Sequence, residues 1–289
     1  MTFISPTYRT IKSHFTHSIK LVALLFILLS LNSCEDVVPV DVDTSAPRLV
    51  IDASIKWAKG TPGSDQRIYL STTSSFYSNV VPKVSGAVVQ INDSQNNVFT
   101  FTENPQVPGE YVCLQFSPVK SETYVLKVVY QNQTYQATET MIESPALTTI
   151  TQDQQGGILG NDIQVKFFFQ DIPNKDSYYL FELNTPLQAL PILRVTDDRF
   201  FANNTMFGLY SNKDLKAGDR LKFTLHGTSK RYYDYMAKLL DIAGSAGGSP
   251  FQTAPATVRG NVVNQTNQDN YPLGYFRVSE TDSKTYVVQ

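Results

Sequence analysis

Apolar and polar side chains alternate with a period of two over residues 48–141, and this pattern constrains the fold more than any other feature of the chain. In the first segment Leu49 and Ile51 fall on one face, while Asp52 and Ser54 fall on the other. Successive side chains of a β-strand point to opposite faces, so each such segment is predicted to be a half-buried strand. The pattern predicts strands at 49–57, 67–72, 86–92, 98–102, 110–116, 123–130 and 134–141.

The segments between these strands are rich in residues that favour turns. They lie at 61–63, 93–97, 105–109 and 131–133. Seven short strands with such breaks are typical of a β-sandwich of immunoglobulin-like or transthyretin-like type. We therefore expect a mainly β protein whose N-terminal domain, residues 48–143, is an immunoglobulin/transthyretin-like sandwich.

A second β-rich domain is predicted for residues 144–289. Ser144-Pro145 and the polar run 152–157 indicate the domain join. One helix is expected near 229–242, because Ser229 can cap its start and Gly244 can end it. The segment 244–250 that follows is predicted to be a flexible loop. The strands expected in this domain are 163–170, 177–184, 219–226, 274–279 and 285–289.

The first 33 residues have the layout of a secretory signal. Basic residues precede an apolar run at 21–31, and the small Ser33 stands directly before Cys34. The run is too short to cross a bilayer, which needs roughly 20 apolar residues. Residues 31–34, Leu-Asn-Ser-Cys, resemble the lipobox of bacterial lipoproteins, in which the cysteine receives the lipid. We expect a signal peptide at 1–33 and a lipidated tether at 34–47.

The charge of the remaining chain limits its partners. Residues 1–33 hold three basic and no acidic residues, so 24 − 3 = 21 Lys and Arg face 26 Asp and Glu, a net charge of −5. This balance argues against a nucleic-acid partner, which needs a basic surface. It also argues against electrostatic adhesion to anionic lipid, so membrane attachment is expected through the lipid on Cys34. Glu35 and Asp36 allow two interpretations, a signal for export to the cell surface or plain acidity of the tether.

Few residues of the mature chain suit catalysis or metal binding. With Cys34 acylated, Cys113 has no intrachain partner and is predicted to be a buried structural thiol. His226 is the one histidine after residue 33, which excludes a His-rich metal site. We interpret it as a strand-end or surface residue rather than a catalytic one. The sequence predicts no metal, no cofactor and no catalytic residue.

Two groups of residues keep other chemistry open. Asp162, Asp197 and Asp198 are candidates for glycoside hydrolysis by carboxylates, although Asp197-Asp198 reads more simply as a turn. Aromatic side chains in predicted loops and an irregular stretch can stack on sugars or anchor a protein interface. The alternative is that they cover sheet edges and the core. These weak candidate binding residues are Phe76, Tyr77, Arg199, Phe200, Phe201 and Tyr210.

The whole mature chain resembles a family of Bacteroidota outer-membrane lipoproteins that is classed as domain of unknown function 4249. One run that carries the resemblance is Ser229-Lys230-Arg231-Tyr232-Tyr233-Asp234-Tyr235 at the predicted helix start. The others lie at 34–38, 47–53, 84–89, 108–111, 123–128, 249–251, 255–261 and 273–276. Genes of this family commonly accompany TonB-dependent receptors. The resemblance therefore implies a surface location and a TonB-dependent outer-membrane receptor as partner, and it transfers no catalytic residue.

The leading hypothesis is a lipid-anchored, non-catalytic binding or accessory subunit of a TonB-dependent nutrient transporter. Two alternatives from other classes stay open. One is an envelope or adhesion module, because β-sandwiches serve that role widely. The other is a glycan hydrolase with two carboxylates facing each other across a cleft.

Overall fold

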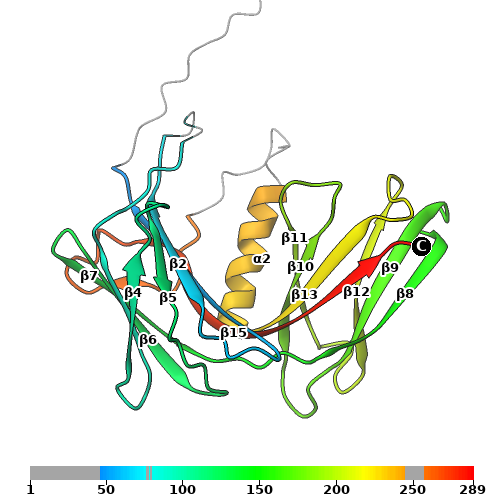
Figure 1. The fold of residues 1–289 in the computed structure, drawn as a ribbon, viewed down its shortest axis with the longest axis horizontal. Coiled ribbons are helices and arrows are strands. Elements are labelled where there is room, and N and C mark those ends of the chain that lie inside the picture. Colours follow the sequence, from blue (N-terminus) through cyan, green and yellow to red (C-terminus); the bar gives the residue numbers. More distant parts are fainter. Residues whose placement is uncertain (1–45, 76–77, 79, 245–256) are drawn as a thin grey trace, which may run out of the picture. The chain divides into compact units, whose positions relative to one another are not determined.

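The computed structural model describes residues 46–75, 78, 80–244 and 257–289. The predicted signal peptide, the lipid site at Cys34, the predicted loop 245–250 and the pair Phe76 and Tyr77 lie outside the described residues. Residues Ala46–Gln289 form one compact unit. It is mainly β, as predicted, and its described residues contain one helix, α2 (Lys230–Gly244) (Figure 1).

The strands of this unit follow the chain in fifteen segments. The first seven are β1 (Leu49–Ala58), β2 (Gln66–Thr72), β3 (Val88–Asn92), β4 (Val98–Glu103), β5 (Glu110–Cys113), β6 (Thr123–Tyr130) and β7 (Gln133–Thr140). The next six are β8 (Leu147–Gly156), β9 (Asp162–Gln170), β10 (Tyr178–Asn184), β11 (Ile192–Asp197), β12 (Thr205–Asn212) and β13 (Arg220–Thr228). After α2 come β14 (Val263–Asn264) and β15 (Leu273–Val287).

Two sheets are formed by these strands. The larger has the order β11-β10-β13-β15-β1-β2-β5-β4-β3-β6-β7-β14, and the smaller has the order β12-β9-β8. The seven strands predicted between residues 48 and 141 are all present as β1 to β7, with ends shifted by a few residues. Alternation identified most of them because one face of the strand is more deeply buried than the other, whereas the short β5 is buried on both faces.

Strand β15 runs through the middle of the larger sheet. Its first part pairs in parallel with β1, and its last part pairs antiparallel with β13. The prediction of two separate strands at 274–279 and 285–289 is wrong. The polar stretch between them continues the ladder, with Thr281 opposite His226 and Asp282 opposite Leu225. Its backbone partners, rather than an apolar pattern, keep this stretch extended.

Three other expectations for this part of the chain are corrected. The polar run 152–157 lies largely in β8, whose edge position allows polar side chains on both faces. Strand β11 was not predicted at all. Tyr210, expected in an irregular stretch, lies in β12, where it is buried while Phe207 on the other face of the strand is exposed. Both faces of β12 are apolar, so the sequence shows no alternation there.

The hydrophobic core is divided into clusters. One is built from Leu49 to Met141 together with three later side chains, among them Phe276 and Val278 of β15. A second begins at Leu147 and lies between β8, β9 and β12 on one side and β10 and β13 on the other. The first cluster gives way to the second near the predicted join at residue 144. Strand β15 nevertheless pairs with strands from both parts of the chain, β1 before residue 144 and β13 after it. The division into two domains stays a prediction, whereas the burial of the Cys113 thiol is confirmed.

Helix α2 covers the face of the larger sheet that points away from the two core clusters just described. The backbone N–H of Tyr232 donates to Ser229 Oγ at 3.2 Å, which confirms the predicted cap. Tyr232 and Met236 are the buried residues of the helix, and they pack with Leu180 and Tyr275. Figure 1 shows the helix standing beside the strands β11 and β10, with β15 passing its lower end. Of the residues described, none forms a helix long and apolar enough to cross a membrane.

Candidate functional site

Polar side chains line the helix-facing side of the larger sheet, where four strands meet. On β15, Phe276 and Val278 point into the first core cluster, so the alternate residue Arg277 points to the other face. On β10 the same alternation puts Glu182 on the opposite face of the strand from the core residue Leu183. We call Arg277, His226, Glu182, Ser54, Asp52 and Lys56 the sheet-face network.

Arg277 is the centre of this network and is only 4% exposed. Its Nε donates to Ser54 Oγ at 3.2 Å, and its Nη1 lies 3.3 Å from His226 Nδ1 and donates to Ser279 Oγ at 3.2 Å. The guanidinium also lies 5.0 Å from the centre of the Tyr232 ring. A buried arginine is stable only when its donors are paired, and here the partners come from three strands and the helix.

Two uncharged side chains connect this guanidinium to carboxylates. The Ser54 hydroxyl, which accepts from Arg277, donates to Asp52 Oδ1 at 3.0 Å. His226 Nε2 lies 3.1 Å from Glu182 Oε2. A neutral imidazole with its proton on Nε2 satisfies both neighbours, because Nδ1 then accepts from Arg277 while Nε2 donates to Glu182. A protonated ring would bring an N–H at Nδ1 against an N–H of Arg277.

The titration of these groups follows from this arrangement. Burial lowers the pKa of His226, the hydrogen bond to Glu182 opposes this shift and the positive charge of Arg277 adds to it, so that the resulting pKa is about 4. The hydrogen bond from His226 lowers the pKa of Glu182 to about 2, although burial opposes that shift. Burial also lowers the pKa of Lys56, whose Nζ lies 3.8 Å from Glu182 Oε2. At neutral pH the network therefore holds a neutral histidine and an ionised glutamate.

His226 has no exposed surface, so the interpretation of this residue as lying at the surface is wrong. It cannot touch a ligand and instead positions Arg277 and Glu182. The Lys56 side chain is 48% exposed and Asp52 is also exposed, so solvent reaches the network at these two residues of β1. The arrangement is suited to holding a polar face rigid rather than to donating a proton to a substrate.

A cavity of about 880 Å³ adjoins this face, between α2 and the segment 257–260. Two rings lie in its wall, Tyr235 and Tyr275, whose centroids are 4.9 Å apart. The Tyr275 hydroxyl donates to Glu139 Oε1 at 3.0 Å, which fixes that ring. We call this cavity the helix pocket, and its charged lining residues are Lys230, Arg231, Asp234, Lys238, Asp241 and Arg259. A cavity of this size with aromatic and mainly basic walls suits a small polar or anionic ligand.

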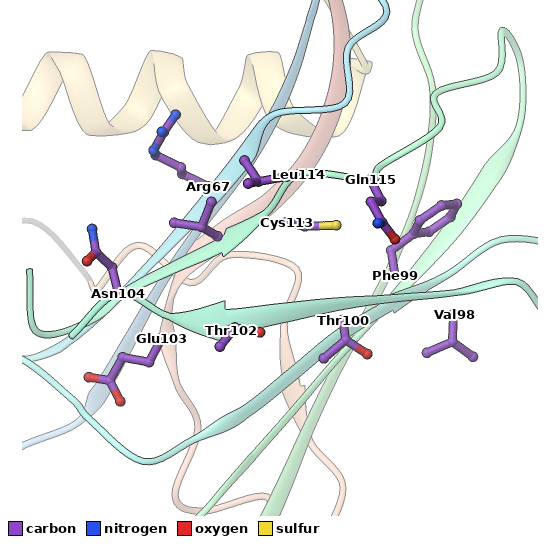
Figure 2. A pocket seen from close by; sticks show the side chains of 11 residues that line it. Arg67, Val98, Phe99, Thr100, Thr102, Glu103, Asn104, Cys113, Leu114 and Gln115 are labelled. Atoms are coloured by element: carbon purple, nitrogen blue, oxygen red, sulfur yellow. The ribbon is translucent and has the colours of Figure 1, made fainter. Parts of the chain in front are cut away.

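A second cavity, of about 870 Å³, opens between β4 and β5. Only two residue pairs join these strands, Thr102 with Val112 and Glu103 with Tyr111. Figure 2 shows the strands running apart on the side where Phe99 and Gln115 lie. The separation leaves part of β4 without a ladder partner on that side. The walls of this second cavity carry fewer charged side chains than the walls of the helix pocket.

A family model described as "Domain of unknown function (DUF4249)" matches residues 35–285. The chain belongs to this family. The match covers nearly the whole chain after the predicted signal peptide, as the resemblance implied. No curated protein matches the chain significantly.

Comparison with solved structures adds no argument about the DUF4249 fold. A DUF4785 family protein from Legionella pneumophila is 10% identical, with a TM-score of 0.25 over 62% of this chain and 52% of that one. A cytokine receptor complex is 6% identical, with a TM-score of 0.25 over 64% and 86%. A pullulanase complexed with maltotriose, from Anoxybacillus sp. LM18-11, is 11% identical, with a TM-score of 0.20 over 62% and 24%. The matched region thus spans about half the length of the first of these proteins.

The structure of this DUF4249 chain does not bring the described aromatic candidates together. Arg199, Phe200 and Phe201 lie in the turn between β11 and β12, where Arg199 pairs with Asp197 at 2.8 Å. Phe200 is 87% exposed. Tyr210 lies near the other end of β12 and packs in the second core cluster.

The carboxylate candidates of the DUF4249 chain also lie apart. Asp162 is the first residue of β9, and Asp197 is the last residue of β11. Asp197 lies close to Ser177, which comes after the last residue of β9. The two carboxylates are therefore near opposite ends of β9. Asp197 accepts from the Tyr233 hydroxyl at 3.0 Å, and Asp198 is buried and accepts from the Ser177 backbone N–H at 2.9 Å. Both side chains thus hold the local turn.

Sequence reasoning missed the sheet-face network and the helix pocket. Arg277 and Glu182 are isolated charges within strands and read as solvent-facing residues. Their partners Ser54 and His226 are more than 40 residues away in each case. The one available signal was the density of tyrosines at the helix start.

Proposed function

We propose that this chain is a lipid-anchored protein of the outer-membrane surface that acts as a non-catalytic binding or accessory subunit of a TonB-dependent nutrient transporter. The observation that carries the proposal is the family match, which begins at residue 35, directly after the lipobox cysteine Cys34. Members of this Bacteroidota family are commonly encoded beside TonB-dependent receptors.

In the proposed mechanism the lipid on Cys34 holds the β-rich body beside the transporter. Tethering raises the local concentration, so a weak contact with the barrel or its cargo is sufficient. The helix pocket supplies the binding surface, with Tyr235 and Tyr275 as the stacking walls. The sheet-face network keeps the strands under this pocket in fixed register. We further propose that residues 48–143 are an immunoglobulin/transthyretin-like sandwich and that residues 144–289 are a second domain.

Co-purification from membranes tests the transporter partnership. The protein carries an affinity tag after Gln289 and is isolated in mild detergent from cells that express it at its natural level. We expect a TonB-dependent receptor among the recovered proteins. Recovery of an envelope or matrix polymer without any receptor would contradict this proposal and support the adhesion alternative.

The anchor is tested separately. Cys34→Ala removes the sulfur that the lipid requires, so we expect loss of lipid labelling and release of the protein from membranes, or accumulation of the unprocessed chain. The matched control is Cys113→Ala, which removes the buried thiol and should leave lipid labelling unchanged. Unchanged labelling of the Cys34→Ala protein would refute the anchor. Protease treatment of intact cells then tests surface exposure, since a periplasmic protein would be spared.

A further inference from the structure

Large apolar side chains project from two turns at one end of the strands β8 to β13. Ile158 and Leu159, between β8 and β9, are 103% and 85% exposed, and Leu190, between β10 and β11, is 78% exposed. Single exposed apolar residues are ordinary, but a set at one end of a molecule marks an interaction surface. We infer that this end docks on the lipid surface to which the anchor holds the protein, an inference that rests on the proposed lipidation of Cys34.

Strand register places these turns at the same end. Asn212 pairs with Ile163, so the turn after β12 lies beside the turn before β9. Asn184 pairs with Lys222, so the turn after β10 lies beside the start of β13. Figure 1 shows all three turns along the upper edge of the view. We call Ile158, Leu159 and Leu190 the apolar tips.

The first of these turns depends on glycine at two positions. Gly157 and Gly160 have φ values of 74° and 71°, in the left-handed region that favours glycine. A side chain at residue 157 would also meet the Asp162 carboxylate. The turn is therefore built so that Ile158 and Leu159 occupy the outermost positions, where no described side chain covers them.

The described unit begins at the same edge, and the predicted anchor precedes it closely in the sequence. Eleven residues lie between Cys34 and Ala46, so the two residues are at most about 43 Å apart even when this segment is fully extended. The start of β1 lies along the upper edge in Figure 1. The backbone N–H of Arg48 donates to Thr73 Oγ1 at 3.0 Å, which ties this start to a loop that carries the exposed Val80 and Val81.

The choice of lipid rather than another partner follows from charge and position. The mature chain has a net charge of −5, so attraction to anionic head groups does not drive docking. Apolar tips on narrow turns instead suit insertion at the boundary between head groups and acyl chains. The short tether already keeps these tips near that boundary, so a modest apolar contact is enough to orient the body.

Site-specific fluorescence tests the docking. The acylated full-length protein is reconstituted in phosphatidylcholine vesicles after Leu159→Cys and labelling with a polarity-sensitive fluorophore. Cys113 is buried and Cys34 is blocked by lipid, so the label is directed to residue 159. We expect blue-shifted emission and quenching by nitroxide-labelled lipid. Phe200→Cys is the matched control, because Phe200 is equally apolar and exposed but lies in a turn at the opposite edge.

The outcomes separate docking from anchoring. Lipid quenching at residue 159 several-fold stronger than at residue 200 supports docking, as does weaker quenching of a label at Leu190→Cys when Ile158→Ser and Leu159→Ser are added. Equal quenching at residues 159 and 200, or a blue shift without lipid quenching, overturns docking. If the protein floats with the vesicles in those cases, the anchor stands. Failure to float refutes the anchor and the docking together.

Discussion

Strand β15 has two buried faces of opposite chemistry. On one face Phe276 and Val278 pack among aliphatic and aromatic side chains of the first core cluster. On the other face Arg277 and Ser279 are equally buried but are held by hydrogen bonds. The same short segment thus lies between an apolar layer and a polar one.

The comparison shows how this chain joins its two groups of strands. An apolar layer is satisfied by side chains of about the right volume, whereas a buried guanidinium needs particular atoms at particular positions. For Arg277 these atoms come from Ser54 on β1 and from His226 on β13, strands that flank β15 on its two sides. The apolar face provides stability, and the polar face fixes which strands are neighbours.

The largest effect is expected on the apolar face. Phe276 is fully buried, so Phe276→Ala removes a ring and leaves a cavity. We expect the free energy of unfolding to fall by about 3–5 kcal/mol, measured by urea denaturation. Val287→Ala, near the exposed end of the same strand, is the control and should cost less than about 1 kcal/mol. A similar loss for both variants would contradict the assignment of Phe276 to the core.

A smaller effect is expected when the polar face is broken. Arg277→Met keeps the length of the side chain but leaves the His226 ring nitrogen and the Ser54 hydroxyl without their donor. We expect a loss of about 2–4 kcal/mol in the free energy of unfolding. Lys56→Met is the matched control, because its exposed ion pair with Glu182 should contribute less than about 1 kcal/mol.

A double-mutant cycle sharpens this result. Arg277→Met and His226→Phe are measured singly and together, and the coupling between the two sites should be about 1–2 kcal/mol. Additive losses would mean that the hydrogen bond between Arg277 and His226 contributes nothing beyond packing. The polar face would then specify the neighbours of β15 no better than the apolar face does, and the proposed difference between the two faces would be wrong.

The same contrast explains how far the fold was predictable from the sequence. Strand β1 was predicted because its faces differ, and α2 was predicted because Ser229 caps a segment with helical spacing. Strand β8 was missed because its side chains are polar. Some of them form hydrogen bonds with another strand and with the C-terminal residue: Gln152 accepts from the Tyr286 hydroxyl at 3.0 Å and donates to the Gln289 backbone carbonyl. Local patterns report burial on one face, and they fail where both faces share one chemistry.

The candidate site was less predictable for a related reason. Arg277 and His226 are 51 residues apart, and they meet only because β13 pairs with the last part of β15. Nothing in the residues around Arg277 distinguishes a buried arginine from one at a solvent-facing strand position. The neighbour order of the strands, which the sequence pattern does not contain, therefore decides the chemistry of this face.

The last predicted effect is the pH dependence of the polar face. The unfolded chain protonates His226 near its ordinary pKa of 6.5, whereas the folded chain does so only near 4. Between these values the unfolded state binds the extra proton, so stability falls as the pH falls. Since one pKa unit corresponds to ~1.4 kcal/mol, we expect a loss of roughly 1–3 kcal/mol from this group between pH 7 and pH 4.

Glu182 extends the same trend and must be separated from it. Its pKa is about 2 in the folded chain and 4.5 when unperturbed, so its contribution is lost below about pH 4.5. Urea denaturation at a series of pH values should therefore show a decline that starts near pH 6.5 and continues below pH 4.5, where protonation of Glu182 replaces protonation of His226 as its cause. His226→Gln removes the titrating ring, so the variant should keep the decline below pH 4.5 and lose the part above it. A variant whose decline still starts near pH 6.5 would show that His226 is not the group responsible, and that the polar face is held in a different protonation state from the one its partners assign.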